Sequence, residues 1–318
     1  MSEYNENDHL NDGFEGLTAD GDEGRSGIPS GFSRLDDLTG GWQESDLIVI
    51  GSRPSMGKTS LALSIAQHAA VDLDPPTGTL VFSLEMSGTQ VAQRLISSRA
   101  QFNPNEVQPD GIGEEEQRKL RKAAREIHAS PLYIDDTPSL SVEEITDKCH
   151  RLQEKSGVGL VVVDYLQLLQ SRGSSFPSDA PREKELAHMT RGLKALAKEM
   201  GVPVIVLSQL NRKVENRGGK KRPQLTDLKG SGSIEQDADV VAFVYRAERY
   251  GITVDEQGKS TEGIAEIIVA KQRNGPIGSV KLAFKKQYGR FEPLSEIDRS
   301  LSEQDSRSGS FFEDDAPF

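Results

Sequence analysis

The chain has 318 residues, enough for one large α/β domain or two small ones, and its hydrophobic fraction of 35% is adequate for a packed core. Its formal net charge of −12, taken alone, argues against a nucleic-acid-binding protein. No stretch approaches the roughly 18–20 consecutive apolar residues that span a bilayer, and the acidic N-terminus has no apolar segment of the signal-peptide kind, so we expect no membrane contact.

Both ends of the sequence have the composition of disordered segments. Residues 1–26 and 297–318 are rich in charged and polar residues and show no hydrophobic periodicity, so they bury too little apolar surface to fold. We therefore expect one folded domain over residues 27–296.

Short apolar runs alternate with helical patterns through the first two thirds of this domain. Runs of β-branched residues between amphipathic helices indicate a mostly parallel sheet with helices on both faces. The predicted fold class is therefore α/β. The apolar runs are 46–52, 78–86, 131–136, 159–169 and 202–210, and the clearest helical patterns are 59–70, 88–100, 141–157 and 182–201.

The C-terminal third has a different pattern, with strands and no long helix between them. Three apolar runs cover residues 237–246, 263–273 and 277–287. The last two are joined by Asn-Gly-Pro-Ile-Gly, which is typical of a turn and predicts an antiparallel hairpin.

The segment "GSRPSMGKTS" lies between an apolar run and a helical pattern, where a phosphate-binding loop belongs. Lys58 would reach the β- and γ-phosphates of ATP, and the Thr59 hydroxyl would hold Mg²⁺. The strict pattern has glycine where this chain has Ser52, a small departure because a compact residue suffices for the turn. The alternative is an ordinary surface turn. The predicted nucleotide-binding residues are Ser52, Arg53, Pro54, Ser55, Met56, Gly57, Lys58, Thr59 and Ser60.

Polar side chains at the ends of three other apolar runs complete a hydrolytic site. Asp164 follows "LVVV" and is placed to hold Mg²⁺, although a carboxylate there could also be an ordinary strand-end residue. Glu85 ends "VFSLE" and can orient or deprotonate a water. Ser208 and Gln209 end another run, and Gln209 can hydrogen-bond a γ-phosphate. In a parallel sheet, these ends converge on one ligand crevice.

Together these motifs resemble the C-terminal motor domain of the bacterial and phage replicative DNA helicases of DnaB type, over roughly residues 27 to 294. The resemblance implies a RecA-like P-loop NTPase fold. It also implies a homo-oligomer, a hexameric ring around single-stranded DNA with ATP between subunits, which translocates 5′ to 3′ and unwinds duplex. The matching segments are 27–59, 82–86, 161–169, 202–212, 230–246 and 267–284.

The resemblance also assigns roles to individual residues. Glu85 matches the family's catalytic glutamate, Asp164 its Mg²⁺ aspartate and Gln209 its γ-phosphate sensor. Lys271 and Arg273 are two apart, so on a strand they point to the same face. Read alone they would be two solvated charges on an edge strand, but the family has cations here that act on the nucleotide of the next subunit.

Contacts to DNA are predicted in two loops. The first holds "NRKVENRGGKKRPQ", with six Lys and Arg against one Glu, and could equally be a solvated loop. In the second, the candidates are Lys229, Gly230, Ser231 and Gly232, whose backbone N–H groups could bind a phosphate together with Arg212. The family's usual Leu-Arg-Glu-Ser-Gly is Leu-Lys-Gly-Ser-Gly here, so the charge is kept but the bidentate geometry of arginine is not.

The two ends of the chain suggest further expectations. The family's helical N-terminal collar has no counterpart in the first 26 residues, which fits either a naturally short, perhaps phage-encoded helicase or part of a split or truncated one. The tail "EDDAPF" resembles the acidic tip by which single-stranded-DNA-binding proteins recruit partners. It could therefore dock replication proteins, or it could simply solubilise the chain.

The single cysteine, Cys149, rules out an intrachain disulfide and fits a reducing, cytoplasmic location. The five histidines show no metal-ligand spacing, and Cys149 and His150 are interpreted as structural or surface residues.

Three functions stay open at this point. The chain could be a ring helicase, a RecA- or KaiC-like DNA-dependent ATPase that does not unwind, or an accessory nucleotide-binding subunit. The intact nucleotide residues argue against the last, and "KQRNGP" with "SIEQDAD" favours the helicase.

Overall fold

The computed structural model describes residues 27–106, 111–170, 181–228 and 231–294. Residues 1–26 and 297–318, which are predicted to be disordered, lie outside these ranges. Two predicted DNA-binding residues, Lys229 and Gly230, also lie outside them.

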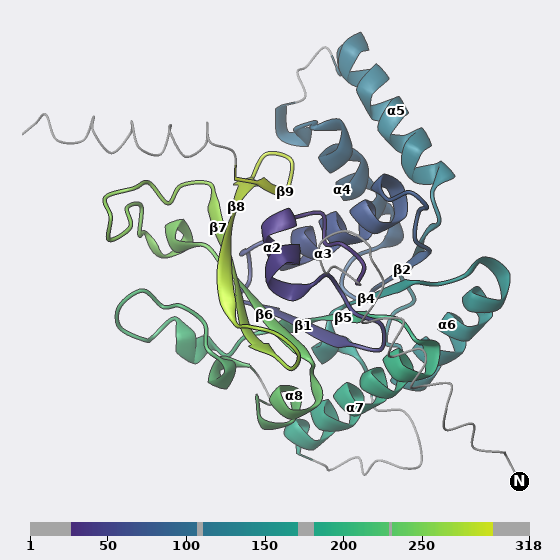
Figure 1. The fold of residues 1–318 in the computed structure, drawn as a ribbon. Helices are drawn as coiled ribbons and strands as arrows, with labels where there is room; N and C mark the ends of the chain where they lie inside the picture. Colours follow the sequence, from purple (N-terminus) through teal and green to yellow (C-terminus); the bar gives the residue numbers. More distant parts are fainter. Residues whose placement is uncertain (1–26, 107–110, 171–180, 229–230, 295–318) are drawn as a thin grey trace, which may run out of the picture.

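One nine-stranded sheet organises the described chain, in the order β3-β2-β4-β5-β1-β6-β7-β8-β9 (Figure 1). The pairs from β3 to β6 along this order are parallel, and those from β6 to β9 are antiparallel. The mostly parallel α/β sheet predicted from the sequence is therefore confirmed. The strands are β1 Leu47–Ser52, β2 Thr79–Ser83, β3 Leu132–Asp135, β4 Leu160–Asp164, β5 Val204–Gln209, β6 Val240–Tyr245, β7 Ile264–Gln272, β8 Gly278–Lys285 and β9 Arg290–Pro293.

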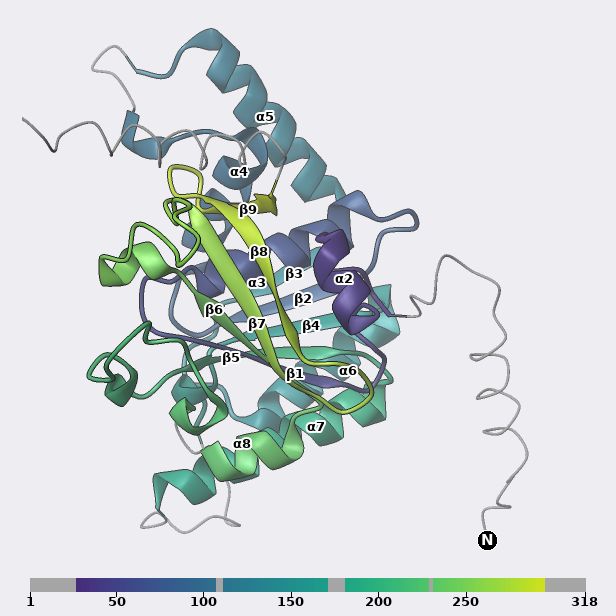
Figure 2. The same cartoon turned by 60° about the vertical axis from the view of Figure 1, so that its left-hand side comes forward.

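Helices cover both faces of the sheet, as Figure 2 shows from a second direction. In β1, Ile48 and Ile50 pack into a core with α2, α3 and α4, whereas Leu47 and Val49 pack into a core with α6 and α7. The period-2 alternation of a strand explains why neighbouring residues enter different cores, and burial on both faces explains why the strand is apolar throughout. The helices are α2 Ser33–Thr39, α3 Lys58–Gln67, α4 Gly88–Ala100, α5 Glu114–Ala129, α6 Val142–Ser156, α7 Arg182–Met200 and α8 Ser231–Asp237.

The predicted C-terminal hairpin is present as β7 and β8, whose register pairs Val269 with Gly278 next to the turn. The helix α8 replaces part of the second predicted DNA-contacting loop, and two further elements were not predicted. The short helix α2 begins after Phe32 without a side-chain cap, and β9 is only four residues long, so neither has a strong local signal.

None of the helices in the described ranges combines the length and the apolar character needed to cross a membrane.

Candidate nucleotide-binding site

The predicted phosphate loop connects the buried strand β1, which ends at Ser52, to α3, which begins at Lys58. Gly57 caps α3 with φ at +101°, a conformation that favours glycine. A Cβ added there would lie 3.0 Å from the Phe291 ring and 3.2 Å from the Phe284 ring. The backbone at this point is therefore held close to β8 and β9, and a larger residue would displace it.

Lys58 and Thr59 both face Asp164 at the end of β4. The Thr59 hydroxyl donates a 2.7 Å hydrogen bond to Asp164 Oδ2, and Lys58 Nζ lies 3.8 Å from Asp164 Oδ1. Lys58 Nζ also lies 4.5 Å from the centre of the Tyr165 ring. Burial lowers the pKa of Lys58, an effect opposed by the carboxylates of Asp164 and Glu85. This largely buried cation is placed to bind a phosphate anion.

The oxygens around Asp164 suit a divalent cation. Asp164 is buried, and its Oδ1 accepts no hydrogen bond from the described residues. The Thr59 hydroxyl stands directly against the other carboxylate oxygen. Mg²⁺ prefers a carboxylate and hydroxyl or phosphate oxygens, so the residues present fit this ion.

Glu85 follows β2, the strand next to β4. Ser83 of β2 pairs with Asp164 of β4, so Glu85 emerges at the same edge of the sheet. Its exposed carboxylate contributes to raising the pKa of Tyr165 after the larger effect of burial, and it also acts on Lys58. An exposed carboxylate beside the buried lysine can accept a proton from a water held between them.

Gln209, the last residue of β5, pairs with Ser52, where the phosphate loop begins. Gln167 supports this strand end, because its side chain donates to the Ser208 hydroxyl at 2.9 Å and accepts from the Gln209 backbone N–H at 3.2 Å. The sheet therefore brings Glu85, Asp164 and Gln209 to one edge, as the parallel pattern predicts.

The side chains of the loop itself have different surroundings. The Ser52 hydroxyl donates to the Arg53 carbonyl at 3.0 Å. Arg53 is buried and directed away from the loop: its Nη1 donates to the Leu210 carbonyl at 2.8 Å and its Nε to Glu215 at 2.9 Å. These side chains brace the loop, so any contact of Ser52 and Arg53 with nucleotide would come from their backbone. Of the remaining predicted residues, Met56 is buried, Pro54 and Ser55 are exposed, and Ser60 is half-buried.

A family comparison now adds to this geometry. The model of the DnaB-like helicase C terminal domain matches residues 27–293.

The chain belongs to the DnaB-like helicase C-terminal domain family.

It is 47% identical over 269 residues to the replicative DNA helicase DnaB of Geobacillus stearothermophilus and 46% identical over 269 residues to the replicative DNA helicase DnaC of Bacillus subtilis. Each match covers 85% of this chain and 57% of the relative, so the chain spans little more than half the length of these proteins. A solved structure described as the ATPase domain of G40P is 37% identical, with a TM-score of 0.81, and the match covers 91% of this chain and 98% of that one. A DnaB-like replicative helicase, solved in a study of its interactions with primase, is 37% identical, with a TM-score of 0.79 and coverage of 90% and 66%.

Membership of this family of ATPase domains implies that the domain binds a nucleotide. One residue of the site was not predicted. Arg246 is buried directly after β6, its Nη1 lies 3.5 Å from the Ser55 carbonyl, and its guanidinium lies 4.1 Å from the centre of the Phe284 ring. Its Nε has no hydrogen-bond partner in the described chain. The sequence offers one weak signal, because an arginine ends the apolar run "VVAFVY" as Asp164 ends "LVVV", but it does not indicate a contact with the phosphate loop.

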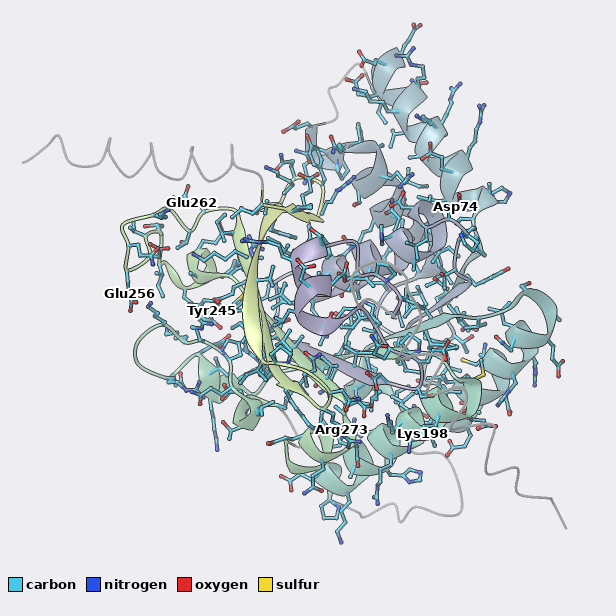
Figure 3. The ribbon with its side chains drawn as sticks, in the orientation of Figure 1. Asp74, Lys198, Tyr245, Glu256, Glu262 and Arg273 are labelled. Carbon is cyan, nitrogen blue, oxygen red and sulfur yellow. The ribbon has the colours of Figure 1, made fainter. Side chains whose placement is uncertain are left out.

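Lys271 and Arg273 lie at the opposite edge of the DnaB-like domain, against the end of α8 (Figure 3 labels Arg273). Lys271 Nζ donates to the backbone carbonyls of Glu235 and Ala238, the latter at 2.6 Å. Arg273 Nη2 donates to the Gln236 carbonyl at 2.6 Å, so both cations do reach the same element. Burial lowers the pKa of Lys271, with a further lowering by Arg273.

Asp239 fixes the position of this edge relative to the phosphate loop. Its Oδ2 accepts a 2.8 Å hydrogen bond from the backbone N–H of Leu47, the first residue of β1, and its Oδ1 lies 3.2 Å from Arg273 Nη1. The phosphate loop follows Ser52 at the other end of β1, about 17 Å away along a six-residue strand. Lys271 and Arg273 therefore cannot contact a phosphate bound to the loop of their own chain.

The predicted DNA-binding residues within the described ranges lie in two places. Gly232 belongs to α8, which ends against Lys271 and Arg273, whereas Arg212 follows β5, whose last residue pairs with Ser52 at the phosphate-loop edge. Gly232 is exposed in the first turn of α8, which begins at Ser231. Arg212 is exposed in a short 3₁₀ helix after β5. No ion pair involves Arg212 or Lys213 among the residues whose placement is described.

Half of the cations in the basic run are already neutralised. Arg217 is paired with Asp227, Lys220 with Glu256 at 2.7 Å and Arg222 with Glu266 at 2.7 Å. The part of this run from Arg217 to Arg222 therefore fits the alternative of an ordinary structural loop. Arg212 and Lys213 remain available for an anionic ligand.

Cys149 lies on the buried face of α6, and burial raises the pKa of its thiol to about 12. His150 Nε2 lies 3.0 Å from Glu199 Oε1. Among the described residues, no group of three or more His, Cys, Asp or Glu could hold a metal ion as a protein-only site.

Proposed function

We propose that this chain is the ATP-driven motor of a replicative DNA helicase, which assembles as a hexameric ring around single-stranded DNA, translocates 5′ to 3′ and unwinds duplex. The main observation behind the proposal is that the predicted catalytic residues lie at two opposite edges of the sheet. Lys58, Asp164 and Glu85 lie at one edge of the sheet, and Arg273 lies at the other. A complete site of this kind requires a second copy of the chain.

At the first edge, the chain's residues support hydrolysis of ATP. Lys58 binds the β- and γ-phosphates and offsets their charge, which its buried ammonium does more effectively than a solvated one. Glu85 accepts the proton of the attacking water as the oxygen–phosphorus bond forms and ADP leaves. Gln209 hydrogen-bonds the γ-phosphate and loses this partner when the phosphate departs. Thr59 and Asp164 would hold Mg²⁺, which supplies charge neutralisation between the phosphates.

At the second edge, Arg273 and Lys271 would serve the nucleotide of the neighbouring subunit. A positioned arginine of this type contributes about 10³–10⁵ in rate because it neutralises transition-state charge. In the isolated chain both side chains are held by the carbonyls at the end of α8. In a ring they would exchange these partners for phosphate oxygens.

Arg212, Lys229 and the backbone of Gly230, Ser231 and Gly232 would contact the DNA phosphates. Such contacts are independent of sequence and weaken with salt. Because α8 starts at Ser231 and ends against Lys271 and Arg273, one short helix connects the proposed DNA loop to the proposed trans-acting cations. This connection offers a route by which DNA contact and hydrolysis at the next subunit can influence each other.

The decisive experiment is strand displacement on a forked DNA with a 5′ tail, comparing the natural chain with Glu85→Gln. ATP-dependent unwinding by the natural chain, with binding but no unwinding by the variant, is the expected result. Hydrolysis on single-stranded DNA without displacement would instead support a non-unwinding ATPase or a subunit that requires a partner. As a helicase, the chain would work in the cytoplasm, and the acidic tip at 313–318 could recruit replication proteins. If deleting Phe318 left the binding of all partners unchanged, that recruitment would be ruled out.

A further inference from the structure

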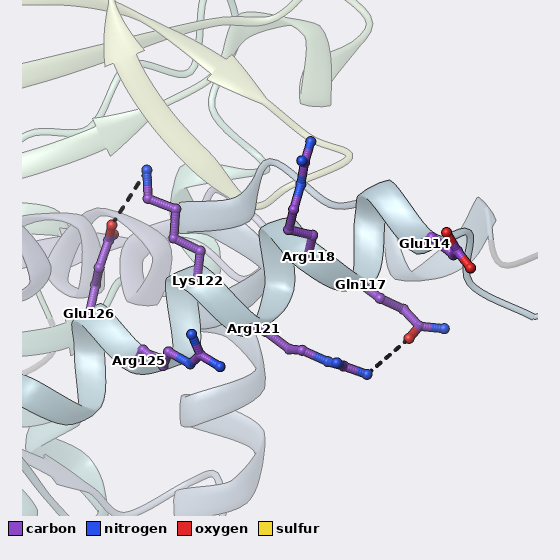
Figure 4. A pocket seen from close by; sticks show the side chains of 7 residues that line it. All are labelled: Glu114, Gln117, Arg118, Arg121, Lys122, Arg125 and Glu126. Atoms are coloured by element: carbon purple, nitrogen blue, oxygen red, sulfur yellow. Dashed lines mark hydrogen bonds and ion pairs between the residues drawn. The ribbon is translucent and has the colours of Figure 1, made fainter.

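The helix α5 carries an exposed basic face on a strongly acidic protein (Figure 4). We define the basic face as Arg118, Arg121, Lys122 and Arg125, which follow the spacing i, i+3, i+4, i+7 and therefore lie on one side of the helix. They line a hollow of about 560 Å³.

The charge of the basic face is largely uncompensated. Among the described residues, Arg118, Arg121 and Arg125 form no ion pair, and Arg121 only donates to the Gln117 side chain at 3.2 Å. Lys122 lies 3.8 Å from Glu126, but that carboxylate already accepts from Arg99 at 2.7 Å. Like charges at these spacings oppose helix formation, so the arrangement favours an anionic ligand that would relieve the repulsion.

The face is also remote from the edge proposed to bind DNA. In Figures 1 and 2, α5 lies at one end of the molecule and α8 at the other. The strand β9 lies at the α5 end. Its Glu292 accepts a 3.4 Å hydrogen bond from Gln101 at the end of α4, and Arg290 donates to the Ser98 carbonyl at 3.2 Å. The end of β9 therefore lies beside the end of α4.

A second hollow, of about 840 Å³, lies between the turn before β9 and the start of α5. Phe102 and Ile112 contribute apolar surface to it, Tyr288 from the turn before β9 contributes a ring, and Lys119 stands at its edge. The hollow is polar over most of its lining, which includes Glu106 and Glu116, and Phe102, Ile112 and Tyr288 give it an apolar part beside the basic face.

We propose that the basic face and this hollow bind the chain's own acidic C-terminal segment. Residues 295–318 carry seven Asp and Glu against two Arg, with the acids Glu313, Asp314 and Asp315 directly after "FF" and before a final Phe318. The acids match the basic face, and the phenylalanines match the apolar part of the hollow at Phe102, Ile112 and Tyr288. From β9 to Glu313 is about 20 residues, which can extend to roughly 66 Å, whereas α5 is about 24 Å long, so the segment can reach every position on the face. The N-terminal segment is also acidic, but it enters at Gly27, whose N–H donates to the Gly40 carbonyl at the end of α2, whereas β9 ends beside α4.

Disulfide trapping in the full chain tests this contact. Gln117→Cys with Ser310→Cys would place one thiol on α5 and one in the tail, and the buried Cys149 can stay because its thiol is shielded. Lys198→Cys with Ser310→Cys is the matched control, since Lys198 is exposed on α7 (Figure 3). In a glutathione buffer, we expect the α5 pair to form an intrachain disulfide at least ten times faster than the control pair.

Charge reversal then separates attraction from mere proximity. Replacing Arg118, Arg121 and Arg125 by Glu should remove the tenfold advantage, and adding Glu313→Arg, Asp314→Arg and Asp315→Arg should restore it. Equal rates for both pairs, insensitivity to reversal, or a disulfide that forms only between chains would each overturn the proposal. If reversal instead weakened single-stranded DNA binding and left trapping unchanged, nucleic acid would be the occupant. The readout is a covalent bond, so the outcome is independent of whether the chain hydrolyses ATP or unwinds DNA.

Discussion

The Thr59 hydroxyl donates a 2.7 Å hydrogen bond to Oδ2 of Asp164, while Oδ1 of the same carboxylate accepts none from the described chain. The two residues are 105 positions apart and meet because α3 starts where β1 and β4 end on the same edge. Half of the buried carboxylate is thus satisfied by the protein, and the other half is directed at Lys58 and the place where Mg²⁺ and phosphate would lie.

From this arrangement we expect Asp164→Asn to weaken binding of a non-hydrolysable ATP analogue about 10- to 100-fold in the presence of Mg²⁺, because an amide is a poorer ligand for the ion and its waters. In EDTA, the natural chain and the variant should bind the analogue with similar affinity. Calorimetric titration of both proteins under both conditions measures this. Asp147→Asn, on the exposed face of α6, is the control and should change neither value. An undiminished magnesium effect in Asp164→Asn would exclude the proposed metal role.

Arg273 and Lys58 should complement each other between chains. We expect Arg273→Ala to reduce ATP hydrolysis by about 10³-fold or more, with nucleotide affinity little changed, and Lys58→Ala to abolish binding. Each variant alone is then inactive. A 1:1 mixture should recover measurable ATPase activity, because some interfaces join an intact Lys58 loop to an intact Arg273.

The test is a steady-state ATPase assay of the two variants, alone and mixed at constant total protein. Arg273→Ala alone at the same total protein concentration gives the baseline. A mixture of Arg273→Ala with the double variant Asp147→Asn/Lys58→Ala is a second pair that should recover activity. If the mixture stays as inactive as its components, either Arg273 does not act between subunits or the chains do not exchange.

Much of this site could be predicted from short stretches of the sequence. The glycine-lysine-threonine loop, the carboxylates at strand ends and the Lys271–Arg273 spacing are all readable within a few residues, and parallel strands place such ends at one edge. Arg246 was missed because its contact with Ser55 spans 191 positions and depends on β6 lying next to β1. That strand order, with β1 between β5 and β6, is a tertiary property with no signal in the periodicity of any one segment.

The structure also reveals what charge patterns leave out. Whether a cation in "NRKVENRGGKKR" is free depends on distant partners such as Glu256 and Glu266. In the same way, the carbonyl that accepts from Arg273 belongs to α8, and the sequence of the strand that carries Arg273 does not indicate this contact.

Cys149 should serve as a silent reporter of unfolding. Burial raises the pKa of its thiol to about 12, so at pH 8 only about one buried thiol in 10⁴ is ionised, and the thiol lies on the core-facing side of α6. We expect thiol labelling at pH 8 to be at least 10³-fold slower in the native chain than in urea-unfolded chain. Mass spectrometry of alkylated protein over time measures the two rates. Rapid labelling of the native chain would show that α6 opens readily.

Asp46 gives the fold a pH dependence of predictable sign. Burial, then the Asp239 carboxylate, raise its pKa from 3.8 to about 6, against the opposing effects of Lys194 and Arg273. An acid with a raised pKa binds its proton more tightly in the folded state, so stability falls as the pH rises from about 4 to about 6 and stays lower above that. Asp46→Asn removes the buried charge and should therefore stabilise the chain at pH 7.5, by about 1 kcal/mol once screening of this half-exposed group is allowed for.

Urea unfolding at pH 5.0 and 7.5 measures this difference. The gain from Asp46→Asn should be clear at pH 7.5 and smaller at pH 5.0, where the natural carboxyl is mostly protonated in the folded chain. Asp147→Asn serves as control, because this exposed carboxylate on α6 has no comparable burial and its replacement should have the same small effect at both pH values. A gain that is equal at the two pH values would point to a packing effect of the amide, since only the ionisation of Asp46 ties the stabilisation to the window between pH 4 and 6.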